Sequence, residues 1–315
     1  MSKGFEQAAL PRAEREKLCE YRFREGGPYW HIATPGNVQE ILFTGSEDFL
    51  FGMNLIAEST FTADVKMLAF ALMSNHIHCI VDCESDRISA FMDHFRKRLR
   101  RYLTSKGRNV NLIKFDCDPI AITSLQMLRN EIVYVHRNGY VVNPSVTPFT
   151  YPWGTGYYYF ADRKFGDNIQ SFNSIGYDKK REILHSRPID LPEKYLCYKG
   201  LIIPSSFCDI CAGERFFRDA HHYFTMLTKN VEAYCEEANR LGDLVVLTDD
   251  ELFPAVSSFC RRRFNVKFPS DLSERDKVEV ARHMRNDFHA SNGQIQRMLN
   301  LNIEVVDSLY PLSAK

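Results

Sequence analysis

The chain has 315 residues, which is enough for two domains and a sizeable buried core. Its composition is ordinary for a globular protein, and its longest apolar run, at 67–73, is too short to span a membrane. The 40 basic and 40 acidic residues balance to a formal charge of zero, which by itself argues mildly against a nucleic-acid partner.

The amino-terminal residues carry no apolar signal core, so we expect a cytoplasmic protein. The nine cysteines are scattered and odd in number, which argues against a disulfide framework and fits that compartment. One Cys-x-x-Cys pair, Cys208 and Cys211, is followed by His221 and His222, and these four side chains could form a zinc site. Two buried or half-buried thiols are the simpler interpretation of the pair.

The first elements in chain order favour a small antiparallel sheet. Residues 29–34 are rich in aromatic and β-branched side chains and predict a strand, and 40–59 carries apolar residues at helical spacing. Two apolar runs follow, at 64–73 and 76–82, and the dipeptide 74–75 between them is a plausible hairpin turn. We therefore expect the second and third strands to be antiparallel neighbours.

A basic helix is predicted next, at 87–103. Between Arg87 and Arg108 there are eight basic residues and one acidic residue, Asp93, which leaves a formal charge of +7. A local field of this kind attracts phosphates even on a neutral protein, although a solvated charged face is the other interpretation. Its apolar face would consist of Ile88, Phe91, Phe95, Leu99 and Tyr102 or Leu103.

A second helix is predicted at 124–138, with Ser124 as its N-cap. The stretch that follows, 139–160, is rich in Pro, Gly and aromatic residues and indicates an ordered segment that closes a domain. Residues 161–245 carry few signals apart from a helix expected at 220–241. The chain is therefore divided into three parts, 1–160, 161–245 and 246–315.

The last part has an all-helical pattern. Helices are expected at 248–264 and 273–288, and two short ones, 294–299 and 303–310, form a helix-turn-helix candidate. A plain helical bundle is the alternative. Gln294 and Arg297, together with the basic run 261–263, favour contact with DNA. The buried side of the short pair would consist of Ile295, Leu299, Ile303, Val306 and Leu309.

Two pairs of residues carry chemistry. His76 and His78 are two apart on a predicted strand, so both imidazoles point to one face, where a divalent cation commonly bridges such rings. A plain surface strand is an equally good interpretation of this pattern alone. Tyr134 and Asn138 lie one turn apart on the second predicted helix, where they could supply a nucleophile and an oxygen ligand. Packing for the tyrosine and helix capping for the asparagine are the structural alternatives.

Five segments in this order resemble the REP-associated tyrosine transposases, which are single-tyrosine HUH enzymes. Each segment is short, but the order makes the set more specific than any member. Ser74 and Gly139 stand where that family has prolines. The segments are HIATPGN (31–37), ILFTGSEDFLF (41–51), MSNHIHCIV (73–81), FMDHFRKRLRRYL (91–103) and YVHRNGYVVNPSVTPFTYPWGTGYYY (134–159).

For the first part of the chain the resemblance implies an α+β fold, a ferredoxin-like HUH domain whose antiparallel sheet carries its helices on one face. The all-α helix-turn-helix-like part, expected from its own pattern, follows this domain. The resemblance also implies a metal-dependent enzyme that cuts and rejoins single-stranded or hairpin DNA through a 5′-phosphotyrosine. The DNA is expected to be repeat-associated. His76, His78 and Asn138 would hold Mg²⁺ or Mn²⁺, and Tyr134 would be the nucleophile. His136 would face away from that side, and a homodimer is expected from the likeness alone. DNA would be held by Arg96, Lys97, Arg98, Arg100, Arg101 and Tyr102.

Two other functions fit parts of the sequence. A non-catalytic, sequence-specific DNA-binding protein would use the carboxy-terminal helices and keep the HUH-like domain as a relic. A histidine-based phosphohydrolase also uses His-x-His strands, but it usually needs a further histidine along the strand. Here Cys79, Ile80 and Val81 follow instead.

Overall fold

The computed structural model describes residues 23–24, 27–36, 40–142, 150–161, 165, 168–229, 247 and 249–311. The chain forms two compact units, one ending at Leu227 and the other beginning at Thr228. Within the described residues, no helix combines the length and the apolar character that a membrane crossing requires.

The first unit contains a four-stranded sheet in the order β2-β3-β1-β4, in which all neighbours are antiparallel. Its elements follow one another as β-α-β-β-α-β, which with this strand order is the ferredoxin-like arrangement. The predicted α+β class with an antiparallel sheet is therefore confirmed. The elements are β1 (Tyr29–Ala33), α3 (Ser46–Thr62), β2 (Lys66–Leu72), β3 (Ile77–Asp82), α4 (Ser85–Ser105) and β4 (Ile120–Ala121).

The hairpin between β2 and β3 sets which side chains share a face of the sheet. Leu72 pairs with Ile77 across residues 74–75, so the predicted two-residue connection is confirmed. Ala71 pairs with His78 in the same ladder. Because successive side chains alternate between faces, His78 lies on the face opposite to Leu72 and Ile77.

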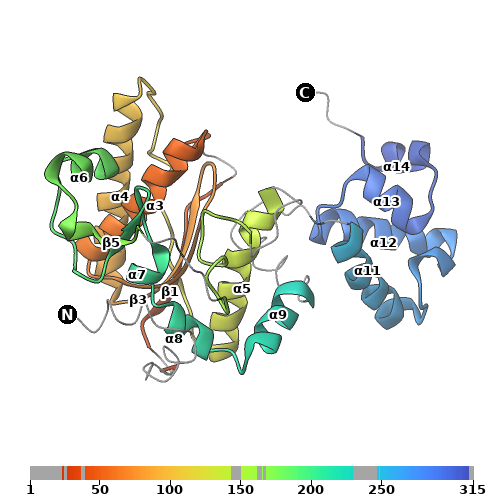
Figure 1. Ribbon diagram of the computed structural model, residues 1–315. Coiled ribbons are helices and arrows are strands. Elements are labelled where there is room, and N and C mark those ends of the chain that lie inside the picture. The colour runs from red at the N-terminus through yellow and green to blue at the C-terminus, as the bar shows by residue number, and fades with distance from the viewer. Residues whose placement is uncertain are drawn as a thin grey trace. The chain divides into compact units, whose positions relative to one another are not determined.

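Helices cover both faces of this sheet. A Cβ atom at Gly52 of α3 would lie 2.6 Å from the Leu72 side chain, so α3 packs on the Leu72 face, and α4 packs along α3. Helix α5 (Leu125–Val142) lies on the other face, with the Tyr134 ring 5.4 Å from the His78 ring (Figure 1). The expectation of helices on one face holds for α3 and α4 and is wrong for α5.

Helix α5 begins where the sequence places its start. The backbone N–H of Met127 donates to Ser124 Oγ at 3.1 Å, so Ser124 is the predicted N-cap. The helix continues to Val142, past the expected end at Asn138. Leu128, one turn into the helix, is fully buried, as the apolar spacing predicts.

Residues 150–161 run beside β2. The hydroxyl of Tyr151 donates to the Leu72 carbonyl at 2.6 Å, and the backbone N–H of Phe70 donates to Thr155 Oγ1 at 2.9 Å. This segment is therefore ordered against the sheet, as expected, while residues 143–149 of the same stretch lie outside the described residues.

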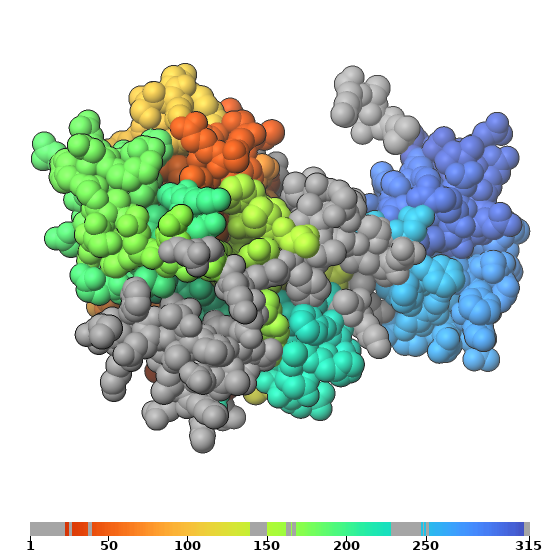
Figure 2. Space-filling view, in the orientation of Figure 1, coloured from red at the N-terminus to blue at the C-terminus, as the bar shows by residue number. Residues whose placement is uncertain are grey.

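Residues 168–227 belong to the first unit and do not form a unit of their own. Asn54 of α3 donates its amide to the Gly200 carbonyl and accepts from the backbone N–H of Ile202, both at 2.8 Å. In Figure 2 the green atoms of this segment lie directly against the orange atoms of α3. The boundary expected at 160 is therefore not where the compact units divide. The elements are β5 (Gln170–Ser171), η1 (Phe172–Ser174), α6 (Tyr177–Leu184), β6 (Leu196–Tyr198), β7 (Leu201–Ile202), α7 (Pro204–Phe207), α8 (Ile210–Arg215) and α9 (Ala220–Lys229).

The helix expected at 220–241 is α9, which is described as far as Lys229, and the remainder of that range lies outside the described residues. In the second unit Ser291 caps α13 through a capping box with Gln294. The predicted pair of short helices is confirmed as helices, but Leu309 is 41% exposed and is not part of the core. The elements are α11 (Asp249–Phe264), η2 (Pro269–Asp271), α12 (Glu274–Asp287), α13 (Asn292–Leu299) and α14 (Ile303–Leu309).

Candidate active site

The predicted histidines and tyrosine come together between the sheet and α5. The ring of Tyr134 lies 5.4 Å from that of His78, and the His76 ring lies 5.0 Å from His78, both measured between centroids. His78 is fully buried, and Tyr134 is 1% exposed. The fold therefore brings Tyr134 beside two histidines that precede it in the sequence by more than 50 residues.

Two further residues join this group, and neither of them was predicted as a site residue. His31 of β1 lies with its ring 5.8 Å from Tyr134, and its Nδ1 is 2.7 Å from the carboxylate Oε2 of Glu131. Both side chains are completely buried. Glu131 and Tyr134 are three residues apart on α5, so they share the helix face that packs on the sheet.

These contacts continue as one row from helix to strand. His31 Nε2 lies 3.1 Å from His78 Nδ1, so Glu131, His31 and His78 form an unbroken line of hydrogen bonds. The Tyr134 ring packs against both imidazoles of this row. Burying a polar group is costly unless it is hydrogen-bonded, and these two contacts bond three buried polar side chains to one another.

The imidazole of His76 is oriented by its neighbour Asn75 and by the loop that follows β1. Asn75 donates its Nδ2 hydrogen to the Gly36 carbonyl at 2.7 Å and turns its Oδ1 toward His76 Nδ1, also at 2.7 Å. A Cβ atom at Gly36 would lie 2.7 Å from His76 Nδ1, so only glycine leaves room for this ring. The amide oxygen accepts, so Nδ1 carries the proton and the lone pair is on Nε2, the donor set that a metal-binding imidazole needs.

A third ligand is less evident. Among the described residues, no three His, Cys, Asp or Glu side chains form a group that could hold a metal ion. The predicted third ligand, Asn138, is a carboxamide; it is buried and donates its Nδ2 hydrogen to the Tyr134 carbonyl at 3.1 Å. That bond holds the side chain along its own helix, and its role as a ligand stays a prediction.

Neither a family model nor a curated protein matches the chain. One solved structure, a REP-associated tyrosine transposase bound to a REP hairpin, is similar to it. The similarity covers 44% of this chain and 82% of that chain, with 19% sequence identity and a TM-score of 0.31. At these values the functional conclusions rest on the contacts within this chain.

His136 is a buried histidine of α5 outside this row. Its Nδ1 lies 2.9 Å from the Tyr223 hydroxyl, and its Nε2 lies 2.9 Å from Thr155 Oγ1. Burial lowers the pKa of His136 to about 3, so the ring is neutral near pH 7. It faces away from the histidine pair, as the helical spacing predicts.

Two members of the predicted DNA-binding set are part of the core. Arg98 is buried and donates to both carboxylate oxygens of Glu58, at 3.1 to 3.3 Å. Tyr102 is also buried: its ring stacks on Phe51 with centroids 3.8 Å apart, and its hydroxyl donates to Asp48 at 2.7 Å. The predictions that Arg98 holds a phosphate and that Tyr102 stacks a base conflict with this packing, and we withdraw them.

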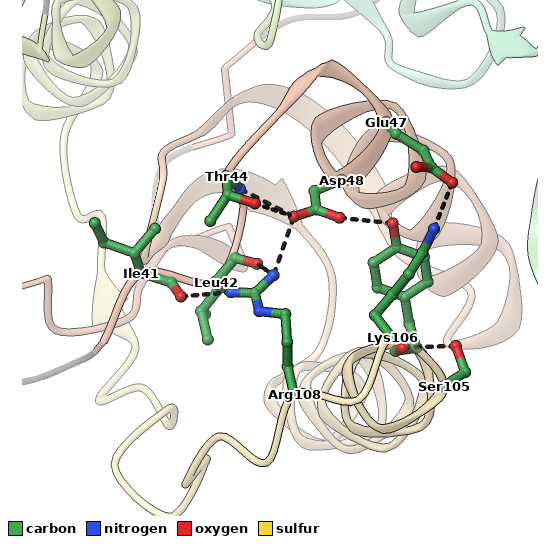
Figure 3. A network of polar contacts seen from close by, with 9 residues as sticks. Ile41, Leu42, Thr44, Glu47, Asp48, Ser105, Lys106 and Arg108 are labelled. Atoms are coloured by element: carbon green, nitrogen blue, oxygen red, sulfur yellow. Dashed lines mark hydrogen bonds and ion pairs between the residues drawn. The ribbon is translucent and has the colours of Figure 1, made fainter.

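Figure 3 shows the polar network around Asp48, which also engages the end of the basic segment. Arg108 pairs with Asp48 at 3.0 Å, and Lys106 pairs with Glu47 at 2.6 Å. Burial alone would raise the pKa of Asp48, but hydrogen bonds from Thr44 and Tyr102, with the Arg108 charge, hold it below its usual value. These two basic residues therefore join α3 to the segment that directly follows α4.

The exposed part of the basic helix is smaller than its charge suggests. Arg96 pairs with Asp93 at 2.7 Å and with Asp116 at 3.1 Å. Lys97, Arg100 and Arg101 are exposed and share one face of α4 by their spacing. This exposed trio lies on the α3 and α4 side of the sheet, whereas Tyr134 lies on the α5 side.

In the second unit, both predicted DNA-contacting residues have partners inside the unit. Gln294 accepts from the backbone N–H of Ser291 at 3.0 Å and donates to the Leu247 carbonyl at 2.6 Å. Arg297 forms a two-point ion pair with Asp249, at 2.7 and 3.0 Å. Each side chain would have to give up such contacts to reach a base.

The Cys-x-x-Cys pair behaves as the simpler interpretation expects. Cys208 is buried and donates its thiol to the Leu68 carbonyl at 3.1 Å, and Cys211 is half-buried. Neither thiol is in a disulfide. Burial also holds the pKa of Cys208 well above its usual value, which favours the protonated thiol over a metal-binding thiolate.

Proposed function

We propose that this protein cuts and rejoins single-stranded or hairpin DNA through a covalent bond to Tyr134. The observation that carries the proposal is the packing of Tyr134 against His78 and His31, inside a cluster of hydrogen-bonded histidines. A tyrosine that only filled the core would be expected among apolar side chains. Here it lies against the two strands that carry the histidines.

In this reaction the Tyr134 hydroxyl oxygen attacks a phosphorus atom of the DNA backbone. The new bond joins Tyr134 to the 5′-phosphate, the bond from phosphorus to the 3′-oxygen breaks, and that oxygen leaves with a proton as a 3′-hydroxyl. One phosphodiester replaces another, so attack by a 3′-hydroxyl on the phosphotyrosine rejoins a strand without any nucleotide cofactor.

His76 and His78, with Asn138 as the predicted third ligand, would hold Mg²⁺ or Mn²⁺ at this site. When bound, such a cation polarises the scissile phosphate and stabilises the charge that develops on its oxygens. The contact of His76 Nδ1 with Asn75 fits this role because it places the lone pair on Nε2, the atom that would bind the cation. Tyr134 is 1% exposed as a residue, so the proposal requires its hydroxyl to be uncovered when DNA binds.

For DNA binding, the exposed trio Lys97, Arg100 and Arg101 would hold phosphates, with Arg96 beside it. In the second unit, Gln294 and Arg297 of α13 would contact DNA in the manner of a helix-turn-helix. An unpaired strand is the proposed substrate because in-line attack needs access to a phosphate that a duplex would crowd.

A strand-cleavage assay tests the proposal directly. A pool of single-stranded and hairpin oligonucleotides with a 3′-terminal fluorophore is incubated with the protein and Mn²⁺, and covalent adducts are resolved on a denaturing gel. The wild type should give a fluorescent protein band that Tyr134→Phe loses completely. Tyr102→Phe is the matched control, because it also removes a buried hydroxyl, and it should keep the band. An adduct that persists in Tyr134→Phe would refute the assignment.

A non-catalytic DNA-binding protein is the second candidate, and two observations favour it. Tyr134 is buried, and Asn138 is bonded to its own helix. The same assay separates the two functions, because a non-catalytic protein would shift the oligonucleotides on a native gel and give no covalent band with any divalent cation.

A further inference from the structure

Each hydrogen bond in the row Glu131–His31–His78 has a donor and an acceptor, and their order determines where the protons lie. We propose that Glu131 and His31 are positioning residues that fix the ring orientation and the tautomer of His78, so that His78 presents its Nε2 lone pair to a cation. The inference rests on the proposed function, since it assigns these two residues to the metal site of that function. Neither residue would touch the DNA or the cation.

The tautomer follows from the order of donors and acceptors. An ionised Glu131 can only accept, so the contact of 2.7 Å requires a proton on His31 Nδ1. A neutral His31 then has its lone pair on Nε2, and the contact of 3.1 Å requires His78 Nδ1 to donate. A proton on Nδ1 of His78 leaves the lone pair on Nε2.

A neutral His31 is the form that suits a cation site. A positive charge on His31 would lie in direct contact with His78 and would oppose cation binding there. It would also put a proton on His31 Nε2, turn His78 Nδ1 into the acceptor, and move the His78 proton to Nε2. The two protonation patterns therefore predict opposite tautomers of His78, which makes the inference measurable.

The second histidine of the pair supplies an internal control. His76 is oriented by the carboxamide of Asn75, which is itself held by the carbonyl of Gly36. Both rings are set to present Nε2, one by this amide and the other by the buried row. A change in the row should alter His78 and leave His76 as it was.

The first measurement is ¹⁵N NMR of the histidine side chains in the metal-free wild type. We expect His78 to carry its proton on Nδ1, as His76 does. A proton on Nε2 of His78 would overturn the inference, and this readout is valid whether or not the protein binds a metal.

The second measurement uses the double variant His31→Leu/Glu131→Leu, which replaces the whole buried pair by apolar side chains of similar size and so avoids an unpaired charge. Mn²⁺ titrated into the full-length protein should bind about 10- to 100-fold more weakly than to the wild type, which is the usual effect of removing such supporting contacts. The His78 tautomer should become mixed while that of His76 stays unchanged. The control His136→Gln alters a buried histidine outside the row and should keep Mn²⁺ affinity.

The outcomes separate this inference from the proposed function. A wild type that binds no Mn²⁺ contradicts the metal site of the proposed function, and the NMR tautomer still decides the inference. A wild type that binds Mn²⁺, with a double variant that binds it equally well, overturns the role of Glu131 and His31 and leaves the proposed function standing. If the double variant does not fold, the tautomer of His78 in the wild type decides the inference by itself.

Discussion

The two faces of the ferredoxin-like sheet both carry buried polar side chains, but they use them in different ways. On the α3 and α4 side, Arg98 and Glu58 form a two-point ion pair, and the Asp48 carboxylate accepts from four donors on three residues. On the α5 side, His31 and His78 adjoin each other, with one carboxylate at the end of the row. Opposite charges cancel in the first arrangement, and only the loss of one partner would be costly. The second arrangement places two imidazoles side by side, as the proposed cation site would require.

Burial alone does not distinguish a structural residue from a candidate functional one, but the neighbours of the residue do. Arg98 and His78 are both in the interior, and both were predicted to act on DNA or on a metal. Only His78 lies beside a second histidine and a tyrosine, in an arrangement that packing does not require. Variants on each face can test whether the two faces differ in this way.

The largest expected effect is a loss of stability from a substitution on the α3 and α4 side of the sheet. Arg98→Met leaves the Glu58 carboxylate buried without its guanidinium partner, which should lower the free energy of unfolding by about 3–5 kcal/mol. Urea unfolding followed by circular dichroism measures this loss. The double variant Arg98→Met/Glu58→Leu removes both charges and should recover most of it. If Arg98→Met were as stable as the wild type, the pair would not hold α3 to α4.

A smaller effect, on the salt dependence of DNA binding, is expected from replacing the exposed trio on α4. Replacing Lys97, Arg100 and Arg101 by Gln would remove the three proposed phosphate contacts. The salt dependence of single-stranded DNA binding should then become shallower by about 2 in the slope of log K against log salt. Fluorescence anisotropy over a range of salt concentrations gives this slope.

The control for the trio is Lys179→Gln/Arg181→Gln on α6, which removes exposed charge from another helix of the same unit. It should leave the slope unchanged. An unchanged slope in the trio variant as well would show that the basic face of α4 is only solvated. Because this face lies across the sheet from Tyr134, that result would confine DNA contact to the α5 side or to the second unit.

The smallest expected effect is on the pH dependence of stability and concerns His136, a buried histidine on α5 outside the row. Its pKa is about 3 in the folded protein and near 6.5 when unfolded, so the unfolded chain takes up a proton first as the pH falls. Its contribution to stability is therefore complete above about pH 6.5 and is lost below it. Between about pH 7 and 5.5 the wild type should lose about 1 kcal/mol more unfolding free energy than His136→Gln does. Equal losses in the two proteins would contradict the buried, neutral state of this ring.

Much of the first unit follows from local patterns in the sequence. The alternation in β3 places His78, with His76 directly before that strand, the spacing in α5 places Tyr134, and Ser124 marks the start of that helix correctly. The strands of the second sheet were not predicted. They are only two or three residues long, which is too short for a hydrophobic period to show.

The residues that were misassigned or missed depend on tertiary packing. Arg98 follows Phe91 by seven residues and therefore lies on the buried stripe of α4, a signal that its charge concealed. Tyr102 was already a candidate for that stripe. Glu131 and His31 belong to elements that were predicted, but their contact joins residues 100 positions apart, and only the packing of α5 on β1 reveals it.

The central claim is that Tyr134 becomes covalently bound to DNA. Mass spectrometry of the protein after reaction with hairpin oligonucleotides and Mn²⁺, followed by nuclease and trypsin digestion, identifies the residue that carries the nucleotide. The account predicts a single modified tyrosine, Tyr134, with a 5′-linked nucleotide phosphate. A modification on any other residue, or cleaved DNA with no modified peptide, would contradict it.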